Sequence, residues 1–371
     1  EQCFDEFWMP GGTSVAGVKE VQLSPKGKLV NRFLRTTAAS PDRGTPYTPV
    51  AFLLDYAHGW EPATVWPTPF GHLLNWSERM PYGEHQHMLR ELFWTAYYPM
   101  GPISQNPITA VSEVNLPGIF GDVFDVIFAY PDIQRWTTID TYPVVIAAGD
   151  MELTQAEGLR LKHYVEGGGT LLVTDAQLTG PGAKTMEPPA LGQRAEAAGY
   201  RWMGEAVTSP SQRYAFRPID GGNPIATTPE GLPICSFFDR GEGRLIVLSV
   251  PRGLGIDRRI TPMMPRLLAH LTAGLMPVEV RGDVQWLVNR SEKGWLVTLL
   301  NPYGQDKPQQ GISATDYRKN RAVTIRTHVP VQSAKDRLLP DDQLTIRTVL
   351  AGVSEISLAV PAGGLRVVQL E

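Results

Sequence analysis

Three side chains capable of acid–base chemistry lie close together in the sequence, directly after an apolar run. The run at 50–54 reads VAFLL, and Asp55, His58 and Glu61 follow it. Two carboxylates and an imidazole can transfer protons or bind a metal ion. The structural alternative is that Asp55 caps the next turn by accepting backbone hydrogen bonds. The two interpretations have similar weight for this loop.

Two further aspartates, Asp150 and Asp175, follow the apolar runs at 144–148 and 170–173. Ligands of open α/β sheets bind beyond the carboxyl ends of the strands, where these aspartates would meet Asp55. An acid–base or metal site is one interpretation of that edge. For Asp150 and Asp175 the preferred interpretation is structural, with each carboxylate capping the helix or turn after its strand.

Aromatic residues are concentrated in the loop and predicted helix after the first apolar run. Flat rings beside polar groups can stack on the C–H faces of sugars, and the same rings dominate protein interfaces. Core packing is the preferred explanation for the set, followed by a protein interface and then by sugar binding. The candidates for sugar binding are Trp60, Trp66, Trp76 and Tyr82.

The sequence predicts no metal site, no cofactor and no reactive nucleophile. His87 and Glu91 have the i, i+4 spacing of helix ligands, but two ligands do not make a site. The glycine patterns of nucleotide-binding loops and the G-x-S-x-G elbow are missing from the sequence. Cys235 lies within an apolar run and is expected to be a small buried residue. Whether it pairs with Cys3 stays open.

Composition excludes further classes of function. The net charge of -4 is not that of a generally basic, nucleic-acid-binding surface. No apolar run reaches the roughly 18 residues of a membrane-spanning helix. The 36 Gly and 32 Pro residues indicate many turns and loops. We therefore expect neither nucleic acid nor a membrane as a partner.

The elements that would position these residues follow an α/β pattern. The clearest unit is a crossover of two buried strands, 144–148 and 170–174, with a helix between them. The sequence Thr154-Gln155-Ala156-Glu157 forms a capping box at the start of that helix, and Gly167 to Gly169 end it. Further predictions are a helix at 191–199, a hairpin of strands 232–238 and 244–250, and a helix at 261–275.

After Met276-Pro277 the pattern changes to strands without helices, which predicts an all-β sandwich. The predicted domains are an N-terminal extension at 1–42, an α/β domain at 43–276 and the sandwich at 277–371. The predicted strands of the sandwich are 284–289, 294–300, 322–329, 344–349, 356–360 and 365–370.

The crossover carries a family resemblance. Its segments 142–146 and 165–173 resemble the amidotransferase-like domain that forms the trimerisation domain of bacterial β-galactosidases. The hairpin with Gly241-Glu242-Gly243-Arg244 resembles the end of that domain, and the C-terminal sandwich is similar to the β domain that often follows it. The resemblance implies a flavodoxin-like, class I glutamine amidotransferase-like parallel sheet.

The resemblance also implies a part that is not catalytic. Active amidotransferase-like members place a cysteine at the elbow after the glycine-led strand, where this sequence reads Val173-Thr174-Asp175-Ala176. In β-galactosidases a preceding barrel supplies the two catalytic carboxylates. Because the chain starts at Glu1 without a Met, we expect residues 1–42 to be the remnant of such a barrel.

The preferred function is that of a non-catalytic C-terminal region of a β-galactosidase-like glycoside hydrolase. It would serve oligomerisation and support a sugar-binding site, with carbohydrate, a second copy or an upstream catalytic domain as partners. One alternative is a stand-alone glycosidase or other hydrolase that uses Asp55, His58 and Glu61. The other is a protein-binding scaffold. The compartment is not determined, although a secreted or periplasmic one is preferred.

Overall fold

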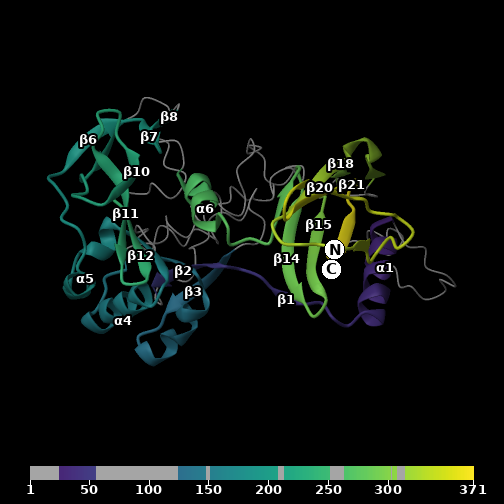
Figure 1. Cartoon of the computed structure of the whole chain (residues 1–371), viewed down its shortest axis with the longest axis horizontal. Helices are drawn as coiled ribbons and strands as arrows, with labels where there is room; N and C mark the ends of the chain where they lie inside the picture. The colour runs from purple at the N-terminus through teal and green to yellow at the C-terminus, as the bar shows by residue number, and fades with distance from the viewer. Residues whose placement is uncertain are drawn as a thin grey trace, which may run out of the picture. The chain divides into compact units, whose positions relative to one another are not determined.

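The computed structural model describes residues 25–55, 124–147, 151–207, 213–250, 263–301, 303–306 and 314–371. Two compact units contain them (Figure 1). The α/β unit holds the described residues of 48–273, and the β unit holds those of 25–47 and 274–371. None of the helices in these ranges is long and apolar enough to cross a membrane.

A mixed sheet of nine described strands forms the centre of the α/β unit. Its order is β3-β2-β4-β5-β12-β11-β10-β7-β8. Neighbours from β3 to β12 pair in parallel, and the remaining pairs are antiparallel. The strands are β2 (Val50–Asp55), β3 (Phe124–Ala129), β4 (Val144–Ala147), β5 (Thr170–Thr174), β7 (Tyr200–Trp202), β8 (Glu205–Val207), β10 (Asn223–Thr227), β11 (Pro233–Arg240) and β12 (Gly243–Leu248).

Strands β2, β4 and β5 of the parallel part are apolar, and both of their faces are covered. Residues 50–54 are all buried, as a continuous apolar run predicts. One core cluster joins strand residues to the helix α4 (Gln155–Glu166) and the 3-10 helix η5 (Ile133–Thr141). Its members include Leu53, Val145, Leu171, Val247, Trp136, Leu161 and Tyr164.

The predicted crossover helix is confirmed together with its cap. The Glu157 N–H donates to Thr154 Oγ1 at 3.3 Å, and the Thr154 N–H donates to Glu157 Oε2 at 2.8 Å. The Gly167 N–H closes the helix by donating to the His163 carbonyl. The next helix, α5 (Pro181–Met186), lies so close that a Cβ on Gly158 would collide with the Gly182 backbone.

The helix predicted at 191–199 is wrong. Residues 195–198 form strand β6 (Ala195–Ala198), which pairs antiparallel with β9 (Arg213–Phe216). Alanine and glutamate favour a helix locally, but the cross-strand pairing and the burial of Ala197 favour the strand. Gly199 then adopts a φ of +71°, which turns the chain into β7. The hairpin of β11 and β12 is confirmed, and the helix predicted at 261–275 is α6 (Met264–Thr272).

The β unit contains two main antiparallel sheets. One has the order β1-β14-β15-β22-β19, and the other has the order β13-β18-β21-β20. The strands are β1 (Thr45–Pro46), β13 (Val278–Arg281), β14 (Gln285–Ser291), β15 (Gly294–Leu300), β18 (Arg321–Thr327), β19 (Ala334–Asp336), β20 (Ile346–Leu350), β21 (Val353–Val360) and β22 (Leu365–Leu370); β16 (Gln305–Asp306) pairs with β17 (Ala314–Thr315), and η7 (Tyr317–Lys319) follows.

A segment near the start of the chain packs with the five-stranded sheet. It consists of the helix α1 (Pro25–Ala39) followed by β1, and Thr45 pairs with Arg290 of β14. The Tyr47 N–H donates to the Val288 carbonyl at 2.9 Å. The described part of the predicted extension 1–42 therefore contributes to the β unit.

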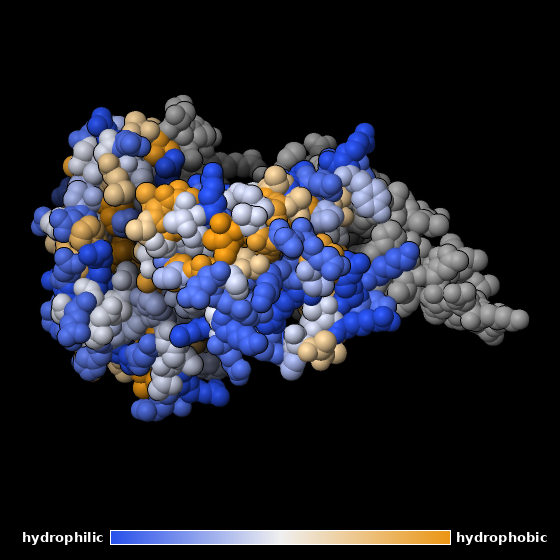
Figure 2. All heavy atoms as spheres, turned by 45° about the vertical axis from the view of Figure 1, so that its right-hand side comes forward, coloured by the Kyte–Doolittle hydropathy of each residue, from blue (hydrophilic) through white to orange (hydrophobic). Residues whose placement is uncertain are grey.

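The surface mixes polar and apolar residues. Hydrophilic residues are spread over the face shown in Figure 2, with apolar residues between them. The exposed large apolar residues include Leu34 in α1, Met203 after β7 and Leu350 in β20. Single exposed apolar residues of this kind are common on folded proteins and need no partner to explain them.

Candidate functional site

The carboxyl ends of the parallel strands form the candidate site of the α/β unit. We call the region around Asp55, Thr174, Asp175 and Gln177 the carboxyl edge. β2, the first described strand of this sheet in chain order, lies between β3 and β4, so the direction of winding reverses beside it. Ligands of open α/β sheets bind beyond the carboxyl ends of the strands at such a reversal.

Only part of the predicted site lies within the described residues. Asp55 ends β2, is half-buried, and pairs in register with Ala129 of β3. The other members of the predicted acid–base set, His58 and Glu61, lie outside the described residues, and Asp150 does too. The grouping of Asp55 with His58 and Glu61 stays a prediction. The predicted sugar-binding residues Trp60, Trp66, Trp76 and Tyr82 also lie outside the described ranges.

The elbow after β5 is closed by a buried amide. The backbone N–H and the hydroxyl of Thr174 both donate to Gln177 Oε1, at 3.0 Å and 2.8 Å. Gln177 Nε2 donates to the Met151 carbonyl at 3.5 Å, and the side chain is fully buried. These bonds connect the 3-10 helix η6 (Asp175–Leu178) with the segment after β4.

Sequence reasoning did not identify Gln177, although a signal was present. Thr174 and Gln177 have the spacing of a capping box, as Thr154 and Glu157 do. Thr174 is the N-cap of only a short 3-10 helix, which contains Gln177, so no amphipathic helical pattern follows it in the sequence. The residue types are suited to holding backbone in place, because an amide both donates and accepts hydrogen bonds.

Asp175 is the described carboxyl whose electrostatics are most altered at this edge. Burial raises the pKa of Asp175, whereas the Arg217 and Arg194 charges and hydrogen bonds from the Asp175 and Ala176 N–H groups act in the opposite direction. The backbone bonds agree with the capping role expected for this residue. A carboxyl with a raised pKa can also retain a proton and donate it to a substrate.

The Glu152 side chain lies close to Gly180, which precedes α5. A Cβ on Gly180 would lie 2.8 Å from Glu152 Oε1, so the carboxylate is in contact with the backbone before α5. Gly180 has a φ of +85°, in the region that favours glycine. A larger residue at position 180 would displace this carboxylate.

The described residues give little evidence for a reactive cysteine or for a metal site. Cys235 lies fully buried in β11, and burial raises the pKa of its thiol to about 12. The complete burial confirms the expectation of a small buried residue. A thiol of this pKa is almost entirely protonated at neutral pH. Across the described ranges, no three His, Cys, Asp or Glu side chains are grouped so as to hold a metal ion.

The fold defined by these elements is a mixed α/β sheet with a parallel part, accompanied by antiparallel sheets. No protein-family model matches the chain, and no curated protein matches its sequence. The chain is similar in structure to parts of solved glycoside hydrolases. The β-galactosidase from Bacillus circulans sp. alkalophilus matches with a TM-score of 0.50 and 13% identity over 93% of this chain and 44% of its own.

Two further structures give similar values. The α-L-fucosidase isoenzyme 2 from Paenibacillus thiaminolyticus has a TM-score of 0.49 and 12% identity, covering 91% of this chain and 51% of its own. A catalytic mutant of a GH42 β-galactosidase from G. stearothermophilus has a TM-score of 0.46 and 14% identity, covering 88% and 41%. The chain thus spans about half, or less, of the length of these enzymes.

Proposed function

We propose that this chain is a non-catalytic region of a β-galactosidase-like glycoside hydrolase, which supports a catalytic domain and takes part in oligomerisation. When the described parallel strands are numbered in chain order, they lie side by side in the order 2-1-3-4-5, which is the order of flavodoxin-like sheets. That order supports the assignment of the α/β unit to the flavodoxin-like, glutamine amidotransferase-like class. The likeness to part of the Bacillus β-galactosidase is compatible with it.

The observation that carries the non-catalytic assignment is the closed elbow after β5. Catalytic members of the amidotransferase-like class hold a cysteine there, whereas this chain has Thr174 bonded to the buried Gln177. The cysteine that the structure describes, Cys235, lies within β11 with its thiol protonated. The side chains of the elbow therefore hold the backbone in place, and no cysteine at the elbow is available to attack a carbonyl group.

The aromatic residues that follow β2 in the sequence would form the wall of a sugar site. Trp60 and Trp66 would stack on the apolar faces of a sugar, and Tyr82 and Trp76 would extend that wall. Intrinsic fluorescence during titration with galactose and lactose tests this role. Trp66→Ala should weaken binding at least tenfold, whereas alanine at the exposed Tyr317 in η7 should not. Equal weakening by both variants, or no binding to the parent chain, would remove the sugar-binding part of the proposal.

The enzymatic part is tested by incubating the chain with a panel of 4-nitrophenyl glycosides. We expect no release of nitrophenol above the buffer rate.

Light scattering at several concentrations should show an oligomer, and a monomer at all concentrations would contradict the oligomerisation role.

A stand-alone hydrolase is the second candidate, because Asp55 lies at the end of β2 where the winding of the sheet reverses. In that case the chain would hydrolyse at least one glycoside of the panel. Asp55→Asn and Glu61→Gln would lower the rate about a hundredfold or more. The control Asp239→Asn, in an exposed ion pair with Arg244, would leave it unchanged. Such a pattern would replace the non-catalytic assignment.

A further inference from the structure

A cavity of about 250 Å³ lies within the β unit, between α1 and the five-stranded sheet. One face of β14, β15 and β22 forms its floor, and α1 covers that face. Leu287, Thr298 and Val367 stand opposite one another on these three strands and form a largely apolar row across the floor. The volume exceeds that of an apolar cavity of about 150 Å³ that admits benzene. The cavity is therefore large enough for a small organic ligand.

The side chains of α1 and the residue after it explain why this space is unfilled. Phe33, Thr36, Thr37 and Ser40 line the cavity and follow one another at helical spacing, so they face the same way. Phe33 packs against the hydrophobic cluster of the sheet. The other three side chains are short, and they cannot reach the sheet as a second large side chain would.

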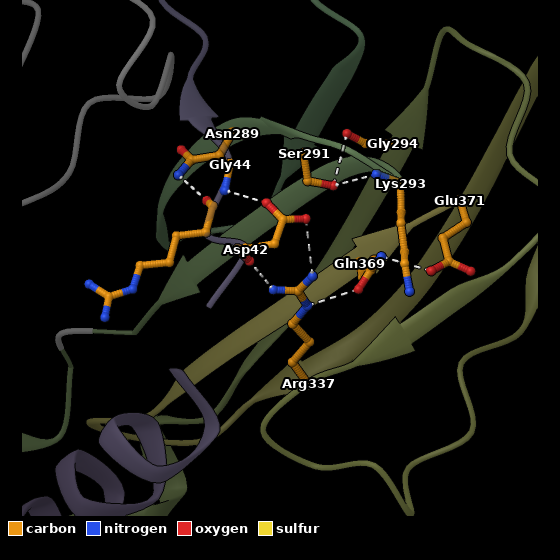
Figure 3. A network of polar contacts seen from close by, with 10 residues as sticks. Asp42, Gly44, Asn289, Ser291, Lys293, Gly294, Arg337, Gln369 and Glu371 are labelled. Carbon is orange, nitrogen blue, oxygen red and sulfur yellow. Dashed lines mark hydrogen bonds and ion pairs between the residues drawn. The ribbon is translucent and has the colours of Figure 1, made fainter. Parts of the chain in front are cut away.

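A neighbouring row on the same face of the sheet holds two arginines that line the cavity. The row consists of Asn289, Leu296 and Gln369, which stand opposite one another. Asn289 Nδ2 donates to the Arg43 carbonyl at 2.8 Å, and Gln369 Oε1 accepts a hydrogen bond from Arg337 Nε at 2.8 Å (Figure 3). Arg43 and Arg337 are thus held at the same end of the cavity.

Arg337 is fixed in place with one of its nitrogens unused. Its Nη1 donates to the Asp42 carbonyl at 2.5 Å, and only 15% of its side chain is exposed. Its Nη2 lies 4.0 Å from the Asp42 carboxylate, which is beyond hydrogen-bonding distance, and it donates to no other described group. A guanidinium presents its N–H donors in a rigid fork. A carboxylate that enters the cavity can accept from Nη2 without moving the arginine.

Arg43 adds a second positive charge at this end. It lines the cavity and is exposed, so it lies where the cavity meets solvent, and no acidic side chain of the described residues pairs with it. The Asp42 carboxylate, which accepts from the Gly44 N–H at 3.0 Å, offsets one of the two charges. The end of α1 carries only a partial negative charge that solvent screens. This end of the cavity therefore favours an anion.

We propose that this cavity binds an aliphatic carboxylate of medium chain length. Its chain would lie over the row that contains Leu287 and Val367, and its carboxylate would accept hydrogen bonds from Arg337 and Arg43. Hydrogen bonds between charged groups are about twice as strong as those between neutral groups. The inference is independent of the proposed role in a glycoside hydrolase.

Three ligands of equal chain length test the proposal on the unmodified full chain at neutral pH. Octanoate is negatively charged, 1-octanol is neutral and octylammonium is positively charged. Titration calorimetry should show that octanoate binds about tenfold more tightly than 1-octanol, as expected for a hydrogen bond between charged groups. Octylammonium should bind more weakly than the alcohol. Binding of the alcohol or the cation as tight as that of octanoate, or no measurable binding of octanoate, would overturn the proposal.

Removal of the unpaired charge provides the second test. Arg43→Gln should weaken binding of octanoate about two- to fivefold, as expected for a pair of charges near solvent, and should leave binding of 1-octanol unchanged. The control Arg347→Gln removes an exposed arginine that pairs with Glu355 in the other sheet, and it should change neither affinity. Octanoate binding by Arg43→Gln that equals that of the unmodified chain would contradict the proposal.

A filled cavity provides the third test. Thr298→Phe places a ring on the floor and should abolish binding of octanoate and of 1-octanol. The control Thr324→Phe lies on β18 of the other sheet and should bind both as the unmodified chain does. Circular dichroism checks that both variants fold, and the Arg43→Gln comparison decides the matter if Thr298→Phe does not. Unchanged binding by folded Thr298→Phe would place octanoate elsewhere and overturn the proposal.

Discussion

Arg366 Nε donates a hydrogen bond to the carboxylate of Asp336, and both side chains are almost completely shielded from solvent. The same carboxylate accepts hydrogen bonds from the N–H groups of Leu338 and Leu339, at 2.7 Å and 2.9 Å. Arg366 Nη1 donates to the Ala359 carbonyl of β21, so this pair connects the two main sheets of the β unit. Both charges thus have partners within a region that is shielded from solvent.

Removing one member of this pair should destabilise the chain strongly. Arg366→Met leaves the Asp336 carboxylate buried without its cation, and we expect a loss of about 3–5 kcal/mol in the free energy of unfolding. The matched control is Arg318→Met, because Arg318 is largely exposed and pairs with Asp316 at the surface. There the loss should be below about 1 kcal/mol. Urea denaturation measures both, and similar losses would contradict the importance of burial.

The elbow after β5 makes a second prediction. Gln177→Leu removes the acceptor of the Thr174 N–H and the donor to the Met151 carbonyl, and each unsatisfied buried group costs about 1–3 kcal/mol. Hydrogen exchange at the Thr174 amide should accelerate together with this loss. Gln134→Leu, at an exposed position of η5, is the control and should change neither quantity. Unchanged exchange at Thr174 in Gln177→Leu would show that the amide does not hold the elbow.

Local sequence signals predicted the parts of the fold that depend on neighbouring residues. Thr154 and Glu157 specify the start of α4, because the bonds they exchange lie within one turn. The predicted strands at 294–300 and 365–370 match β15 and β22. Continuous apolar runs are also enough to predict β2 and β5, because these strands are covered on both faces.

Local sequence signals do not predict the pairing of strands that are far apart in the chain. The short segment Thr45–Pro46 becomes a strand only because β14 supplies its partner, Arg290. Residues 195–198 become a strand because β9 lies beside them, although their composition favours a helix. At the carboxyl edge, the sequence predicts the position of Asp55 at the end of its strand. The hydrogen bonds of Gln177 are seen only in the structure.

Cys235 provides a prediction about reactivity. Because burial raises the pKa of its thiol to about 12, almost no thiolate forms at pH 8 in the folded chain. A Cys3→Ser variant isolates this thiol, and we expect negligible labelling by 5,5′-dithiobis(2-nitrobenzoate) without denaturant. Addition of urea should expose the thiol and give one equivalent of labelling. Rapid labelling of the folded variant would contradict the burial of Cys235.

Tyr142 provides a prediction about alkaline pH. Burial and the hydrogen bond to Asp125 raise the pKa of Tyr142 to about 12, from an ordinary value of about 10. A raised pKa means that the folded state favours the protonated phenol. Its contribution to stability is complete below about pH 10 and is lost as the pH rises towards about 12.

Tyr142→Phe should therefore have a free energy of unfolding that falls less steeply between pH 10 and 12 than that of the parent chain. The exposed Tyr317 gives the control, since Tyr317→Phe should reproduce the parent slope. Denaturation with urea at a series of alkaline pH values measures this slope. Identical slopes for Tyr142→Phe and the parent would exclude Tyr142 as the source.

The pairing of β1 with β14 determines the order in which the chain can complete its units during synthesis. Asn289 and Arg43, which join across this contact, are 246 residues apart in the chain. At about 5–20 residues per second, a ribosome needs roughly 12–50 s to make the stretch between them. During that interval the described strands of the nine-stranded sheet emerge, while α1 and β1 lack the sheet on which they pack. The unit that holds α1 and β1 is therefore the last to be finished.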